Sequence, residues 1–294
     1  MTTSSDKIIL ALGGGAARGA AHVGVLKGME EDGVEVAAVA GTSMGAIVGA
    51  MLAEGLSADE MAEVFNAVNS LAVGRILVRS VLGNAFHDLL VEILGTGEIE
   101  ALTMPYCAVC CDLDSGEELV LREGGVADAA RASAAIPGVL SPMRIGGRTL
   151  IDGGTVNPVP MTAAHTLGDL PVLGVNVLRP PSPGERPAGE QDVQSPSPRR
   201  SPLVERIEGW VRRTVRQEEG SERTVEDVLP GRWEVVERGY NILQYRLAVA
   251  MCGREETIEP DVGRFGWFDF QHSATIIEEG YRAWRRYRAG EARS

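Results

Sequence analysis

The chain of 294 residues is 44% hydrophobic and 23% charged, which is the composition of an ordinary soluble globular protein. Its net charge of −13 argues against a nucleic-acid partner, because attraction to phosphates needs a positive face. The charge is unevenly placed: residues 1–178 carry 9 Lys/Arg and 21 Asp/Glu, whereas residues 179–294 carry 19 and 20. If the protein contacts an anionic membrane, we expect its arginine-rich second part to face that membrane.

Signals for export, membrane insertion and metal binding are weak. The apolar run at residues 8–12 is too short for a signal peptide and ends in glycines. Residues 36–53 carry no charge, but polar residues and glycines interrupt them, and a membrane span needs about 20 apolar residues. The four cysteines and the four histidines lack paired metal-ligand spacing (Cys107, Cys110, Cys111, Cys252; His22, His87, His165, His272). We therefore expect buried, reduced thiols, no metal or cofactor, and a cytoplasmic location.

The pattern of apolar residues predicts alternating strands and helices. Strands are predicted at residues 7–12, 34–40, 106–111, 118–121, 148–151 and 172–177. Helices are predicted at residues 17–32, 44–54, 58–68, 76–94, 126–134, 203–215, 233–252 and 273–288. This order indicates an α/β class protein with three α/β/α layers and a mostly parallel central sheet.

The composition divides the chain into three parts. Residues 1–178 are predicted to form the α/β core. Residues 179–202 hold seven of the 15 prolines, so we interpret this stretch as a flexible linker or insertion. Residues 203–294 are predicted to form a helical C-terminal part that packs on the core.

A serine lies in a tight turn between the second predicted strand and the next helix. The pattern Gly41-x-Ser43-x-Gly45 is the spacing that a nucleophile elbow requires. Glycines allow a sharp reversal and a close approach of helix to strand, and the helix places its positive end near the Ser43 hydroxyl. The alternative is a chance string in a chain with 36 glycines.

The first strand is followed by a glycine-rich loop, Gly13 to Gly19, that leads into a helix. Its backbone N–H groups suit an oxyanion hole, a phosphate cradle for a dinucleotide, or a plain tight turn. The dinucleotide pattern Gly-x-Gly-x-x-Gly fails in both frames, because Arg18 or Ala16 stands where a glycine is needed.

Asp152-Gly153-Gly154 follows another predicted strand. Both strands are predicted to be parallel, which would place Asp152 and Ser43 at the same edge of the sheet, where active sites of α/β proteins form. The alternative is an aspartate with only a turn-forming role. No histidine is convincingly placed as a base, so Asp152 is the candidate that would act directly on Ser43.

At this point the sequence resembles the patatin-like phospholipase family, especially its small bacterial members. The likeness covers residues 7–178, and weakly the tail around residues 258–262 and 268–270. Five motifs in order carry it: Gly13–Gly19, Ala21–Leu26, Gly41–Gly45, Ala135–Val139 and Asp152–Pro160.

The resemblance implies a Ser43–Asp152 dyad that hydrolyses lipid acyl esters without a metal. It also implies an oxyanion hole in which Gly14, Gly15 and Ala16 donate backbone N–H groups. Arg18 matches the family's basic position, which would fix the loop or balance negative charge; the alternative is a surface arginine. Ala16 departs from the family, which usually has glycine there, so its methyl group bears on the donor geometry and the level of activity.

Two other functions stay open at this stage. One is a catalytically weak or inactive protein of the same fold with a lipid-binding or regulatory role, and a nucleotide-binding enzyme is a more distant alternative. The sequence does not predict the head group, the acyl length or the oligomeric state.

Two predicted helices combine aromatic or apolar residues with arginines. These are residues 203–215, with Trp210, and the last helix, with Tyr281, Trp284 and Tyr287. One interpretation is peripheral membrane contact or a lid over an acyl pocket. The other is packing in the core or a dimer with a solvated arginine face.

Overall fold

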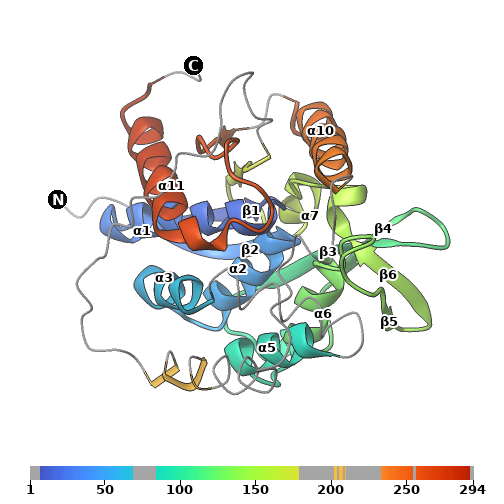
Figure 1. Ribbon diagram of the computed structural model, residues 1–294. Coiled ribbons are helices and arrows are strands. Elements are labelled where there is room, and N and C mark those ends of the chain that lie inside the picture. Colours follow the sequence, from blue (N-terminus) through green and yellow to red (C-terminus); the bar gives the residue numbers. More distant parts are fainter. Residues whose placement is uncertain are drawn as a thin grey trace, which may run out of the picture.

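The computed structural model describes residues 7–68, 84–178, 233–253 and 256–291, together with a few positions between 202 and 209. Within these ranges, an eight-stranded sheet lies between two layers of helices (Figure 1). The predicted three-layer α/β/α class with a mostly parallel core sheet is therefore confirmed.

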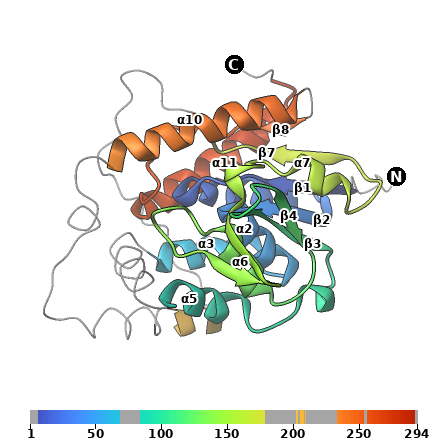
Figure 2. The same ribbon diagram turned by 90° about the vertical axis from the view of Figure 1, so that its right-hand side faces the viewer.

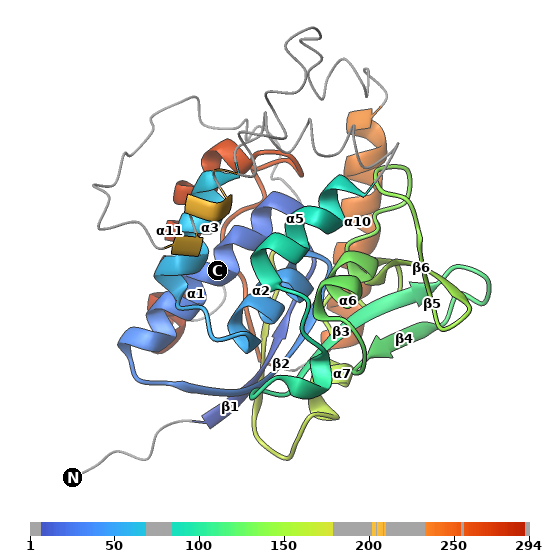
Figure 3. The same ribbon diagram turned by 90° about the horizontal axis from the view of Figure 1, so that it is seen from below.

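The sheet has the strand order β5-β6-β3-β2-β1-β7-β8, and β4 also pairs with β3. The strand bounds are β1 Lys7–Leu12, β2 Glu35–Thr42, β3 Tyr106–Asp112, β4 Glu118–Leu121, β5 Met143–Ile145, β6 Arg148–Asp152, β7 Val172–Val175 and β8 Thr257–Ile258. Parallel pairing joins β3 to β2, β2 to β1, β1 to β7 and β7 to β8. Figure 3 shows β4, β5 and β6 together at one end of the sheet.

The central strands are apolar on both sides because both of their faces are covered. In β1, Leu10 and Leu12 belong to the larger apolar cluster, whereas Ile9 and Ala11 belong to a second cluster across the sheet. We call these sides of the sheet the first face and the second face.

The first face is covered by six of the described helices, and the second face by two. On the first face lie α1 Ala20–Glu31, α2 Met44–Ala53, α3 Ala58–Ala67, α5 Ala85–Leu94, α6 Val126–Ser133 and α11 Ser273–Arg288. On the second face lie α7 Met161–His165 and α10 Trp233–Cys252. Short 3₁₀ turns occupy Ala16–Gly19, Ile99–Ala101, Gly153–Thr155 and Phe270–His272.

The last helix packs tightly on the first. A Cβ atom on Gly24 of α1 would lie 1.8 Å from the carbonyl oxygen of Ile277, and one on Gly280 of α11 would lie 1.9 Å from that of Ala21. The indole of Trp284 is buried and donates a hydrogen bond of 2.9 Å to Asp32. The C-terminal helix therefore turns Trp284 into the core, as the packing interpretation predicted for this element.

Three short elements escaped the sequence prediction: β5, β8 and α7. A turn at Gly146 and Gly147, with φ of 58° and 78°, joins β5 to β6. Two glycines with positive φ form a tight hairpin of this kind. After this reversal β6 runs antiparallel to β3, so the prediction of a parallel strand before Asp152 is wrong.

The C-terminal part contributes more than helices. Strand β8 extends the sheet by pairing in parallel with β7, so residues far along the chain complete the core sheet. The predicted linker at 179–202 falls almost wholly outside the described residues, as do residues 69–83 and most of the predicted helix at 203–215.

Candidate active site

Ser43 occupies the turn between β2, which ends at Thr42, and α2, which begins at Met44. Its backbone has φ 54° and ψ −122°, a region in which a residue other than glycine costs about 1–3 kcal/mol. The turn is also crowded: a Cβ atom on Gly41 would lie 2.4 Å from the Ala46 Cα, and one on Gly45 would lie 2.1 Å from the Leu12 oxygen. A side chain at either position would clash, which explains why glycines stand at 41 and 45.

Ser43 and Asp152 lie in direct hydrogen-bond contact. The Ser43 hydroxyl donates to Asp152 Oδ2 at 2.6 Å, and both residues are buried. Their strands approach along β3 from opposite directions, since Thr42 pairs with Val109 and Asp152 pairs with the adjacent Cys110. The two residues meet because β2 and β6 end at neighbouring positions of β3.

Burial raises the pKa of Asp152 from its ordinary value to about 6. Hydrogen bonds from the Ser43 hydroxyl and the Gly154 N–H, the latter at 2.6 Å, oppose this rise. Gly153 is packed so closely that a Cβ atom there would lie 2.1 Å from the Val109 oxygen. The two glycines after Asp152 thus hold the carboxylate against the elbow. A carboxylate with a raised pKa accepts a proton more readily than an exposed one.

A second serine, Ser133, holds the backbone of the elbow by a hydrogen bond, and the sequence pattern did not predict it. The backbone N–H of Ser43 donates to the Ser133 hydroxyl at 2.9 Å, and that hydroxyl donates to the Val109 oxygen at 2.5 Å. Ser133 ends α6 and is fully buried. The one signal in the sequence is a polar residue at the end of an alanine-rich helix.

The glycine-rich loop lies against Ser43, since a Cβ atom on Gly14 would be 3.3 Å from the Ser43 Cβ. The N–H of Gly13 donates to the Val175 oxygen at 3.0 Å, and that of Gly14 donates to the Pro158 oxygen at 2.9 Å. Gly14 is therefore engaged in holding the loop, contrary to its expected role as an oxyanion donor.

The N–H groups of Gly15 and Ala16 have no hydrogen-bond acceptor among the described residues. Ala16 has a φ of 50°, so its backbone adopts the left-handed conformation that the family's usual glycine permits. For alanine this conformation costs on the order of 1 kcal/mol. The departure at Ala16 is thus accommodated in the fold, and its side chain lines the pocket described below.

Arg18 and Gly19 hold the end of the loop. Arg18 is buried, and its Nε donates to the Phe265 oxygen at 2.8 Å, so the alternative of a surface arginine is wrong. Its backbone N–H donates to Gly15 within the loop. A Cβ atom on Gly19 would lie 2.3 Å from the Met44 side chain. Arg18 therefore ties the loop to the C-terminal part of the chain.

None of the four histidines is hydrogen-bonded to Ser43. His22 is buried, and its Nε2 donates to the Gly13 oxygen at 2.8 Å. Burial lowers the pKa of His22 to about 4, so its imidazole is neutral and holds the glycine loop. His87 instead contacts Asp128 at 2.9 Å on the surface.

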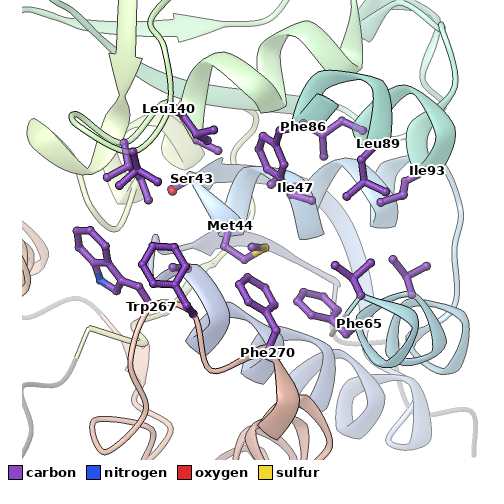
Figure 4. A pocket seen from close by; sticks show the side chains of 18 of the residues that line it. Ser43, Met44, Ile47, Phe65, Phe86, Leu89, Ile93, Leu140, Trp267 and Phe270 are labelled. Atoms are coloured by element: carbon purple, nitrogen blue, oxygen red, sulfur yellow. The ribbon is translucent and has the colours of Figure 1, made fainter. Parts of the chain in front are cut away.

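Ser43 opens onto an apolar pocket with a free space of about 870 Å³, counting its open mouth. Figure 4 shows Ser43 near Leu140 and Trp267, whereas Ile93 and Phe65 lie at the other end of the pocket. Ser43 is the one lining residue with a hydroxyl, carboxyl, amide or basic group among those described.

The C-terminal part supplies one wall of this pocket through Trp267, Phe268 and Phe270. Trp267 is fixed by its indole N–H, which donates to Asn241 of α10 at 2.7 Å. In the sequence, only a weak family likeness around residues 268–270 marks this wall, and no local pattern predicts a pocket there.

Within the described ranges, no cluster of His, Cys, Asp and Glu residues could hold a metal ion. The four cysteines are buried thiols, as expected. None of the described helices combines the length and hydropathy needed to cross a bilayer.

Comparison with known proteins agrees with this geometry. The family model described as patatin-like phospholipase matches residues 10–96 and 112–165, which include the glycine-rich loop, the elbow and Asp152. The chain belongs to the patatin-like phospholipase family.

The relatives of this patatin-like chain are mostly longer proteins. An uncharacterized NTE family protein of Mycobacterium tuberculosis is 38% identical over 180 residues, which cover 59% of this chain and 48% of that protein. Human patatin-like phospholipase domain-containing protein 6 is 34% identical over 187 residues, which cover 59% of this chain and 14% of that protein. The chain therefore matches about half or less of the length of these relatives.

A solved structure supports the fold. VipD from Legionella pneumophila superposes with a TM-score of 0.51 over 98% of this chain and 67% of the VipD chain, at 12% sequence identity. A likeness at this level of identity concerns the fold alone.

Proposed function

We propose that this patatin-like chain is a serine acyl hydrolase that cleaves fatty-acyl esters of lipids. The observation that carries the proposal is the 2.6 Å hydrogen bond from the Ser43 hydroxyl to Asp152, at the end of an apolar pocket. An apolar pocket with one reactive hydroxyl suits an acyl chain whose ester group lies at Ser43.

In the first step Asp152 accepts the hydroxyl proton while Ser43 Oγ attacks the acyl carbonyl. The tetrahedral oxyanion accepts hydrogen bonds from the N–H groups of Gly15 and Ala16, and the adjacent N-terminus of α2 favours the negative charge. The intermediate collapses when the C–O bond to the alcohol breaks. Asp152 returns the proton to that alcohol, and an acyl-enzyme remains.

In the second step water attacks the acyl-enzyme. Asp152 accepts a proton from the water, the oxyanion is held by the same donors, and the ester bond to Ser43 breaks. Asp152 then returns the proton to Ser43 Oγ, and the fatty acid leaves. This cycle consumes one ester and one water, and it needs no imidazole and no metal.

Release of fatty acid from a phospholipid or a long-chain acyl ester tests this proposal. We expect Ser43→Ala and Asp152→Asn each to lower kcat by about a thousandfold or more, because both residues act in the same steps. Ser57→Ala is a matched control, since Ser57 caps the start of α3 and is not among the residues that line the pocket. Undiminished hydrolysis by Ser43→Ala would refute the proposal, and lipid binding without turnover by the wild type would support the non-catalytic alternative.

A further inference from the structure

Helix α10 exposes an apolar face to solvent. Among the described residues, seven large hydrophobic side chains are exposed, and five of them lie on this helix. The five are Val235, Val236, Ile242, Leu243 and Val249. Leu243 is 69% exposed and Val235 is 75% exposed, so these side chains are almost fully in water.

These side chains form one surface. Val235, Ile242 and Val249 recur every seven residues, and Val236 and Leu243 form a second row with the same spacing. Because seven residues make nearly two turns of an α-helix, the two rows run side by side along one face. Exposed Gly239, Arg246 and Ala250 lie within it. We call this surface the outer face of α10.

The opposite side of α10 is packed and fixes the helix. Ala248 and Cys252 belong to the apolar cluster on the second face of the sheet. Asn241 accepts the hydrogen bond from Trp267, and the Tyr240 hydroxyl contacts Thr155 at 3.0 Å. Rotation of the helix would break these contacts, so the outer face cannot be buried in that way.

Helix α10 departs from the acidic charge of the whole chain, because it carries two glutamates and two arginines whereas the chain has a net charge of −13. Both glutamates, Glu234 and Glu237, lie near its start, and residues 238–252 contain two arginines and no acidic residue. Both of these arginines, Arg238 and Arg246, are exposed. Glu237, the residue before Arg238, accepts a hydrogen bond of 2.8 Å from the Trp267 backbone N–H and is held beside the pocket wall.

Helix α10, which carries the outer face, contacts the wall of the candidate active site. The rings of Tyr240 and Trp267 meet edge to face with their centroids 5.5 Å apart, and Trp267 lines the pocket. In Figure 2, α10 runs lengthwise along the outside of the molecule, with the sheet beneath it. A surface that binds this helix would therefore be held close to the wall of the pocket.

We propose that the outer face of α10 docks the protein on a lipid surface that carries anionic head groups. This inference rests on the proposed function, because the ester substrate would lie in that surface. Aliphatic side chains would enter the interface, while the arginines would reach the head groups. The face contains no aromatic side chain among those described, unlike the aromatic-rich centres of protein–protein interfaces.

The test measures sedimentation of the full chain with vesicles of phosphatidylcholine containing about one-third phosphatidylserine. The Ser43→Ala variant is used so that the lipid stays intact. We expect this variant to bind the vesicles. We expect the added change Leu243→Glu to weaken binding by about tenfold or more, because the leucine side chain that would move from water into the lipid is lost. Leu113→Glu is the matched control: Leu113 is also exposed but lies in the turn after β3, and its change should leave binding within about twofold.

Several results would overturn the docking proposal. These are no vesicle binding, equal binding with and without Leu243→Glu, or equal binding to vesicles without phosphatidylserine. A wild-type dimer that Leu243→Glu converts to a monomer would instead assign the face to a second copy of the chain.

Parallel assays with a soluble short-chain ester separate this inference from the proposed function. We expect Leu243→Glu to reduce hydrolysis of vesicle lipid by a larger factor than hydrolysis of the soluble ester. Hydrolysis of the soluble ester without vesicle binding would refute only the docking surface. Vesicle binding without hydrolysis of any ester would refute only the proposed function.

Discussion

Ser43 and Asp152, 109 positions apart in the sequence, share a 2.6 Å hydrogen bond because their strands run toward each other along β3. The elbow leaves β2 at the level of Val109, and the carboxylate leaves β6 at the level of Cys110. The meeting of the two groups therefore depends on one antiparallel pairing in a mostly parallel sheet.

The buried carboxylate predicts opposite effects of Asp152→Asn on activity and stability. The folded protein holds the pKa of Asp152 at about 6, above its ordinary value of 3.8. Ionisation in the folded state therefore costs stability at neutral pH, and a difference of about 2 pKa units corresponds to roughly 3 kcal/mol. We expect Asp152→Asn to abolish hydrolysis while raising the free energy of unfolding by about 2–3 kcal/mol at pH 7.

Denaturant unfolding of the two proteins checks this expectation. The wild type should lose stability relative to Asp152→Asn as the pH rises from about 4 to about 6, because the unfolded carboxyl releases its proton first. Asp112→Asn is the control with the opposite sign, since hydrogen bonds from Asp114 N–H and Arg148 lower the pKa of Asp112. A destabilised Asp152→Asn protein at pH 7 would contradict the effect of burial.

The same pKa predicts the pH dependence of hydrolysis. Asp152 must be ionised to accept the Ser43 proton, so kcat/KM should fall about tenfold per pH unit below a midpoint near 6. Above the midpoint the rate should reach a plateau. Initial rates on a soluble ester between pH 4.5 and pH 8.5 would reveal the profile. A rate that stays constant down to about pH 4.5 would rule out Asp152 as the base.

Ser133 is predicted to position the elbow. Ser133→Ala removes the acceptor of the Ser43 N–H, and an unsatisfied buried donor costs about 1–3 kcal/mol. We expect lower stability together with a kcat reduced by about tenfold and a KM little changed, because the pocket walls stay in place. Ser57→Ala, which removes the cap of α3, should lower stability without this loss of kcat. Equal kcat values for the two variants would assign Ser133 a purely structural role.

Much of this arrangement follows from local sequence patterns. The spacing of Gly41, Ser43 and Gly45 predicts the elbow because close packing at both glycines leaves no room for a Cβ atom. Asp152 was identified through its place at a strand end, although the direction of that strand was predicted wrongly. The three-residue strand β5 is too short for a periodic signal, and it decides the direction of β6.

Other parts of the site could not be predicted from local patterns. Ser133 contacts the Ser43 N–H across 90 positions of sequence, and Trp267 reaches the pocket from the C-terminal part. The oxyanion role expected for Gly14 was wrong because its N–H is used by Pro158. Each of these contacts depends on tertiary packing, which residue spacing does not encode.

The far end of the pocket is predicted to limit acyl length. Ile93 is nearly buried and lies at the end of the pocket away from Ser43 (Figure 4). Ile93→Trp would fill this end, so we expect the preferred ester to become shorter by several carbons while short-chain esters are still hydrolysed. Overpacking costs about 1–3 kcal/mol, so thermal unfolding should be measured in parallel. An unchanged preference across a series of ester chain lengths would place the acyl chain elsewhere.

The measurement that tests the central claim most directly is covalent labelling by a fluorophosphonate, read by intact mass and peptide mapping. The account predicts one adduct per chain on the peptide that contains Ser43, its absence in Ser43→Ala, and much slower labelling of Asp152→Asn. Labelling of Ser43→Ala at the wild-type rate, or a wild type that stays unlabelled, would contradict a nucleophile activated by Asp152.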